Sequence, residues 1–163
     1  MISLQPADDK QFSAVTELLE RLRNLSGDDQ RRIADAVRFG FLDNFRNERA
    51  GDEGDWPSLS NMTIKERAKR GFGPRPIQVQ TGSFRDSWTK RGAAGHIEKF
   101  SAGKGGWSLD VGSGDERVNL LGYGGVNGLG YYVPPRPVVF LSEDAEDRIT
   151  RVIESIIDRV NAE

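Results

Sequence analysis

The chain of 163 residues contains no cysteine and a single histidine, His96. The lack of cysteine excludes disulfide bonds, thiolate metal ligands and cysteine nucleophiles, and one histidine cannot build a histidine-rich metal site. No apolar run approaches the roughly 20 residues of a membrane-spanning helix, so no contact with a membrane is expected. Residues 1–10 lack the basic and apolar regions of a secretory signal peptide, and the composition is typical of a protein made in a reducing compartment.

The motifs of common enzymes are also missing. His96 and Glu98 form a His-x-Glu pair, but the zinc deaminases that use such a pair also need a Pro-Cys-x-x-Cys motif. The glycine-rich residues 122–130 do not fit G-x-G-x-x-G, and no Lys-Ser/Thr of a P-loop follows them. No carboxylate cluster has metal-binding spacing. The sequence therefore predicts that the protein is not an enzyme, with no catalytic, cofactor-binding or metal-binding residue and no cofactor.

Charge is segregated along the chain, although the 23 basic and 25 acidic residues nearly balance. Residues 56–91 carry a net charge of +6, whereas residues 1–55 and residues 143–163 each carry −4. A basic segment between acidic ends fits either a nucleic-acid surface or a subunit face that meets the acidic face of a neighbour. Aromatic residues, which single-strand binders place among their cations, do not interleave residues 65–70, and this favours the subunit contact.

Three long stretches have helical periodicity. Residues 8–24 and 28–46 carry apolar side chains three and four positions apart, and their short connection predicts an antiparallel helical hairpin. Ser26 is expected to cap the second of these helices. Residues 143–161 repeat the pattern, and acidic residues in their first turn complement the helix dipole.

Shorter elements are predicted between the long helices. Residues 47–61 read as a polar loop, and residues 63–70 read as a short helix. A second short helix follows, with Phe84 on its apolar face, and we expect Thr81 or Ser83 to cap it.

Glycine dominates residues 92–141 and disfavours helix there. Alternating polar and apolar residues at 96–100 and 107–111 predict two half-buried strands joined as a hairpin. We interpret residues 112–133 as a long adaptable loop and residues 137–141 as a compact apolar strand.

These elements predict an α+β fold. The length suits a single domain over residues 1–163. The expected architecture is a small, mostly antiparallel sheet packed by N-terminal helices and a long C-terminal helix.

A series of segments gives the chain a recognisable order. A helix ending in aromatic residues precedes an acidic, glycine-containing loop with a tryptophan, and then a basic helix, a Thr-Gly-Ser turn and a Pro-Arg-Pro segment. These segments are residues 41–45, 51–60, 63–70, 80–88 and 133–142. In this order and spacing they resemble the phage virion morphogenesis or tail-completion family, which includes neck proteins of tailed bacteriophages.

The resemblance implies a structural virion protein of the phage neck. Such a protein completes the tail and joins it to the head connector as a subunit of a homo-oligomeric ring, for which a hexamer is favoured. The implied partners are further copies of the chain, the head–tail connector or a portal-side neck protein, and the tail terminator or tail tube protein. Genomic DNA passing through the neck is a further contact. The implied location is the virion, after assembly in the host cytoplasm.

Two other functions stay open on the sequence. One is a module that contacts DNA through the basic residues 65–91, and the other is a tail terminator protein. Eight residues are expected at interfaces, although internal packing is the favoured alternative for Trp56 and a rigid turn is the favoured alternative for Arg136. The eight are Trp56, Lys65, Arg67, Arg70, Arg75, Trp88, Tyr123 and Arg136.

Overall fold

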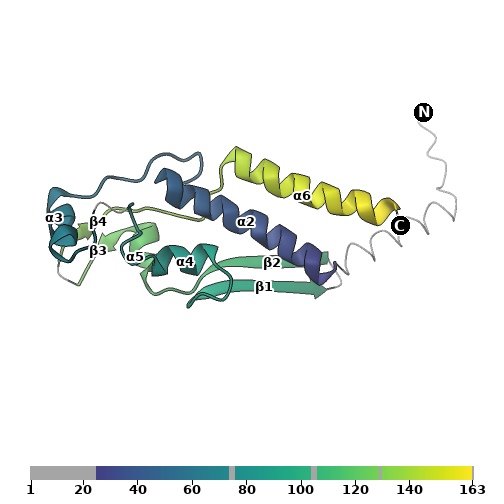
Figure 1. The fold of residues 1–163 in the computed structure, drawn as a ribbon, viewed down its shortest axis with the longest axis horizontal. Coiled ribbons are helices and arrows are strands. Elements are labelled where there is room, and N and C mark those ends of the chain that lie inside the picture. Colours follow the sequence, from purple (N-terminus) through teal and green to yellow (C-terminus); the bar gives the residue numbers. More distant parts are fainter. Residues whose placement is uncertain (1–24, 74–75, 104–105, 129, 163) are drawn as a thin grey trace, which may run out of the picture.

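The computed structural model describes residues 25–73, 76–103, 106–128 and 130–162, and its architecture is α+β, as predicted (Figure 1). The helices are α2 (Gly27–Asn47), α3 (Asn61–Lys69), α4 (Ser83–Thr89), α5 (Arg117–Tyr123) and α6 (Glu143–Ala162). The strands are β1 (His96–Gly103), β2 (Gly106–Ser113), β3 (Gly125–Val126) and β4 (Tyr132–Val133). They form two antiparallel pairs, β1 with β2 and β3 with β4. In the described ranges no helix has the length and apolar character to span a membrane.

Helix α2 is the central element and confirms the predicted helix 28–46. Ser26 caps it as expected: the Ser26 Oγ accepts a hydrogen bond of 3.2 Å from the backbone N–H of Asp29. Phe45, near its end, is buried in a first hydrophobic cluster, and Ile33, near its start, is buried in a second one. The predicted helix 8–24, and with it the helical hairpin, lies outside the described residues.

Helix α6 confirms the predicted C-terminal helix and runs antiparallel beside α2 (Figure 1). Gly40 of α2 makes the close approach between them. A Cβ at Gly40 would lie 2.7 Å from the Leu141 side chain and 3.1 Å from the Cβ of Ala145. Further along, Ile156 and Val160 of α6 pack with Ile33 in the second cluster.

The hairpin of β1 and β2 confirms the alternation found in the sequence. Its inner face carries half-buried Phe100, Trp107 and Leu109, which pack against α2 and α6. The rings of Phe100 and Trp107 stack with centroids 5.5 Å apart. On the outer face Lys99 and Asp110 are exposed opposite one another in the register. The helices therefore cover one face of the sheet and leave the other in solvent.

Two local predictions are wrong. Gly82, in the left-handed region at φ 88°, is the N-cap of α4 in place of Thr81 or Ser83, and the Thr81 Oγ1 accepts only a long hydrogen bond of 3.4 Å from the backbone N–H of Ser83. Residues 112–133, predicted as a loop, contain α5, β3 and β4. Helix α5 begins because the Asp115 Oδ1 accepts a hydrogen bond of 2.9 Å from the backbone N–H of Arg117.

Asp29 connects the start of α2 to the end of α6. Its side chain is 2% exposed and accepts hydrogen bonds of 2.6 Å from the Ser26 Oγ and from the Arg159 Nη2. Burial raises the pKa of the Asp29 carboxyl, but the hydrogen bonds from Ser26 and Arg159 and the Arg159 charge outweigh burial, so the pKa lies below its usual value. The ionised carboxylate is therefore the form that holds the two helices together.

Asp29→Asn is expected to lower the free energy of unfolding at pH 7 by about 1–3 kcal/mol, because it removes a charge-assisted pair. A lowered folded pKa means that the folded state binds fewer protons, so this stabilisation is present above the unfolded pKa of about 3.9 and is lost as pH falls through the folded value. Urea titrations between pH 7 and pH 3 should show a smaller acid loss in the variant than in the wild type. Asp28→Asn, at an exposed neighbour, is the control, and an equal effect of both substitutions contradicts the assignment.

Candidate interaction surfaces

Residues 136–140 form an irregular segment that pairs with no strand, so the predicted strand 137–141 is wrong. Side chains from other elements take the place of a neighbouring strand by donating to its carbonyl oxygens. The bonds run from Gln78 Nε2 to Arg136 O (2.7 Å), from Trp56 Nε1 to Pro137 O (2.9 Å), and from Asn44 Nδ2 to Val138 O (2.8 Å) and Phe140 O (2.6 Å). These four bonds satisfy carbonyl oxygens of the segment that no neighbouring strand pairs with.

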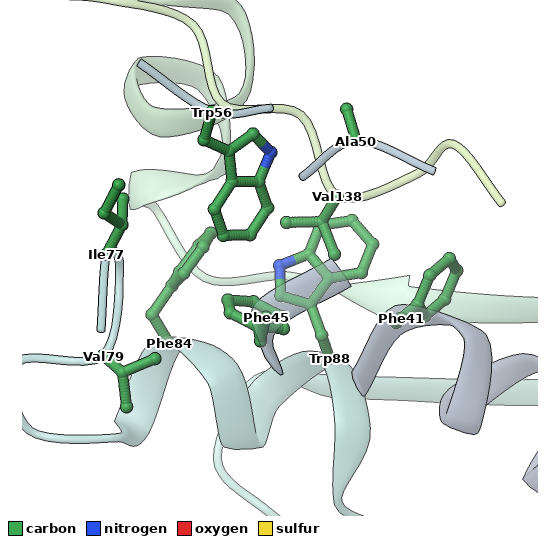
Figure 2. Close-up of a cluster of buried hydrophobic side chains, with 9 residues drawn as sticks. All are labelled: Phe41, Phe45, Ala50, Trp56, Ile77, Val79, Phe84, Trp88 and Val138. Atoms are coloured by element: carbon green, nitrogen blue, oxygen red, sulfur yellow. The ribbon is translucent and has the colours of Figure 1, made fainter. Parts of the chain in front are cut away.

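Trp56 and Trp88, both expected at interfaces, lie in the first hydrophobic cluster (Figure 2). They are 4% and 5% exposed. Trp56 meets the ring of Phe45 edge-on at 5.5 Å, and Trp88 meets the ring of Phe41 edge-on at 5.3 Å. Their side chains therefore fill the core, which corrects the interface prediction for both residues and agrees with the alternative of internal packing for Trp56.

Two of the arginines expected at interfaces are buried as well. The Arg136 guanidinium donates to the carbonyl oxygen of Pro57 from Nε (2.9 Å) and from Nη2 (2.7 Å). The Arg67 Nη1 donates to the carbonyl oxygen of Pro76 at 3.3 Å. Burial lowers the pKa of both guanidinium groups. Their contacts lie within the fold, so the interface prediction is corrected here too: Arg136 anchors a rigid turn through carbonyl groups.

Of the other four residues expected at interfaces, three are exposed. Lys65, Arg70 and Tyr123 are exposed, and Tyr123 retains 79% of its accessible surface. Arg75 lies outside the described residues. Lys65 and Arg70 come from α3 and its C-cap, and Tyr123 comes from the end of α5. Figure 1 shows α3 at the same end of the molecule as the β3–β4 pair that follows α5.

This end of the molecule exposes six large apolar side chains, which we call the aromatic tip. They are Met62 (54%), Ile64 (51%), Tyr123 (79%), Val126 (67%), Tyr131 (54%) and Tyr132 (69%). Backbone contacts hold the tip in place: Val126 pairs with Tyr132 across β3 and β4, and the Arg136 N–H donates to Leu121 O at 2.8 Å. Exposed apolar side chains at one end of a molecule mark surfaces that bind other proteins, and tyrosine is enriched at such contacts.

A second surface gathers acidic residues from two segments far apart in the sequence. The Asp52 Oδ2 accepts a hydrogen bond of 2.7 Å from the backbone N–H of Glu143, which sets the loop after α2 against the first turn of α6. We call the exposed carboxylates of both segments the acidic shoulder. They are Asp52, Glu53, Asp55, Glu143, Asp144 and Glu146. Val139 (53%) and Phe140 (44%) are also exposed, and Leu141 and Ser142 separate them from the start of α6.

The basic residues of segment 65–91 do not form one continuous cationic surface. Three of them are paired within the chain: Lys69 with Glu66 at 2.8 Å, Arg85 with Asp86 at 2.6 Å and Arg91 with Glu98 at 2.5 Å. In the part of the chain that the structure describes, Lys65 and Arg70 have no salt-bridge partner. Because affinity for DNA grows with the number of phosphates neutralised, these pairs weaken the alternative of a DNA-contacting module.

The described residues offer little that could bind a small ligand. In this part of the chain, no group of three or more acidic or histidine side chains could hold a metal ion. A cavity of about 160 Å³ lies between the start of α2 and the hairpin, lined by residues that include Arg31, Glu98 and Phe100. It is smaller than the roughly 300–1,000 Å³ of typical ligand pockets. This cavity is therefore not a candidate ligand site, and the two exposed surfaces are the candidates that remain.

Comparisons with protein-family models, curated proteins and solved structures found no match. Sequence reasoning identified Tyr123 at the tip but missed Val126, Tyr131 and Tyr132. The available signal was the adjacent tyrosine pair in a glycine-rich stretch, where a loop would not be expected to concentrate aromatic rings.

Proposed function

We propose that this chain is a structural virion protein of the neck of tailed phages. It completes the tail and joins it to the head connector as a ring subunit, and it acts by binding, without catalysis or a cofactor. The observation that carries the proposal is the aromatic tip, with six exposed apolar side chains. The order of the segments that resemble the tail-completion family supports it.

A neck subunit has to bind neighbours of different kinds. The proposed partners are further copies of the chain, the connector or a portal-side neck protein, and the tail terminator or tail tube protein. Two surfaces of different chemistry, the aromatic tip and the acidic shoulder, suit such a role because they select different complementary surfaces. The network around residues 136–140 supports both surfaces by holding the chain between β4 and α6.

Deletion of the reading frame from a phage genome that encodes it is the test. We expect filled heads and tails of normal length that do not join, visible by electron microscopy of the lysate. Purified wild-type chain added to that lysate should restore infectivity. Tyr131→Ser combined with Tyr132→Ser should not restore it, because the variant removes two rings of the tip. Lys99→Glu, on the exposed face of the hairpin, should restore it fully.

Two outcomes contradict the proposal. Undiminished infectivity of the deletion phage excludes a required neck subunit. Tails of abnormal length instead of unjoined tails indicate a tail terminator protein, the alternative that the sequence left open.

A further inference from the structure

We infer that the aromatic tip of one copy docks head to tail on the acidic shoulder of a second copy. The inference rests on the proposed function only in taking the chain to be a subunit of an assembly. It names the two surfaces that meet and the residues that supply the charges. Complementary charge and matching exposed apolar groups on the two surfaces carry it.

The charges of the two surfaces are opposite. Lys65 and Arg70 are exposed beside the tip and have no salt bridge within the described residues. The shoulder presents six exposed carboxylates. Within the described residues only Asp52 among them has a salt bridge, in which the Arg49 Nη2 lies 3.9 Å from the Asp52 Oδ1. Contact between these cations and the excess of carboxylates is favourable, and the same charges disfavour a tip-to-tip or shoulder-to-shoulder contact.

The apolar groups also match. Val139 and Phe140 are 53% and 44% exposed, and the Asn44 Nδ2 holds their segment by donating to Val138 O and Phe140 O. Tyrosine rings of the tip can cover these two side chains, while the charged residues lie around them. An apolar centre surrounded by polar and charged residues is the usual anatomy of a protein interface.

The two surfaces belong to different parts of the molecule. The tip is formed by α3, α5 and the β3–β4 pair, whereas the shoulder is formed by the first turn of α6 and the loop after α2 (Figure 1). A contact between two different surfaces is heterologous, so each copy in a series keeps one tip and one shoulder for its neighbours. Such contacts close into a ring or extend as a filament.

A charge exchange between the two surfaces tests the inference. One variant carries Lys65→Glu and Arg70→Glu at the tip, and the other carries Glu53→Lys and Asp144→Lys at the shoulder. Light scattering gives the mass of each full-length protein, alone and in a 1:1 mixture, at low and high salt. Circular dichroism confirms that each is folded, and Lys99→Glu is the control for a charge reversal outside both surfaces.

We expect the wild type and Lys99→Glu to self-associate, and each double variant alone to associate at least tenfold more weakly. The 1:1 mixture should regain association, because the unchanged tip of the shoulder variant meets the unchanged shoulder of the tip variant. High salt should weaken every contact. A monomeric wild type, double variants that associate like the wild type, or a mixture without recovery each overturns the inference. The neck function is tested separately, by the joining of heads and tails in the deletion phage.

Discussion

Asn44→Asp is expected to lower the free energy of unfolding by about 3–5 kcal/mol, the largest effect expected of a substitution that barely changes volume. Asn44 is 3% exposed, and its Nδ2 donates to the carbonyl oxygens of Val138 and Phe140. Its Oδ1 accepts a bond of 2.9 Å from the Gly51 N–H. A carboxylate keeps the last bond, loses the other two and places a buried negative charge against two carbonyl dipoles.

Urea unfolding at pH 7, followed by tryptophan fluorescence, measures this effect, since two tryptophans lie in the first cluster. Asn47→Asp provides the matched control, because Asn47 is exposed at the end of the same helix. It should cost no more than about 1 kcal/mol through the helix dipole. Equal losses in the two variants contradict the role assigned to Asn44.

Gly51→Ala is expected to destabilise the fold by at least about 3 kcal/mol, through conformation and through steric conflict. Gly51 lies in the left-handed region at φ 55°. A Cβ there would lie 2.6 Å from the carbonyl carbon and oxygen of Leu141, where backbone cannot move aside without displacing the start of α6. The substitution therefore separates the two segments that make the acidic shoulder.

Gly92→Ala isolates the conformational part of this effect. Gly92 also has a positive φ, 76°, but no described atom lies within 4 Å of an added Cβ. The left-handed conformation alone costs about 1–2 kcal/mol, so thermal unfolding should show a much smaller loss than in Gly51→Ala. If both substitutions cost the same, the close approach of Gly51 to Leu141 is not a determinant of stability.

The long elements of the fold could be predicted from the sequence because their signals are local. Helix α2 follows from the spacing of Ile33, Phe41 and Phe45 and from the Ser26 cap. The hairpin follows from alternation, since the residues that alternate in the sequence also alternate in burial along β2. Acidic residues in the first turn, together with apolar periodicity, similarly indicated α6.

The missed features depend on contacts between distant residues. Residues 136–140 have the apolar character of a strand, but their carbonyls are bound by Asn44, Trp56 and Gln78, between 58 and 96 positions away. No local pattern distinguishes this arrangement from strand pairing. The high glycine content near α5 likewise predicted a loop. The hydrogen bond from the Arg117 N–H to the Asp115 side chain at the start of this helix has no comparable signal in the composition.

The candidate site was only partly predictable for the same reason. Net charge along the chain indicated a basic middle and acidic ends, but it could not show which cations are paired. Arg67 and Arg136 turn out to bind carbonyl oxygens inside the fold. The acidic shoulder joins residues on either side of a hydrogen bond between Asp52 and Glu143, 91 positions apart. Its composition becomes visible only when the fold is known.

Electron cryomicroscopy of purified virions, with mass spectrometry of their proteins, tests the central proposal most directly. The virions must come from a phage that encodes this chain. The proposal predicts that the chain is a virion component and that copies of the α2–α6 pair and the β1–β2 hairpin fit a ring of density between connector and tail. Absence of the chain from the virions, or neck density that this fold does not fit, contradicts the proposal.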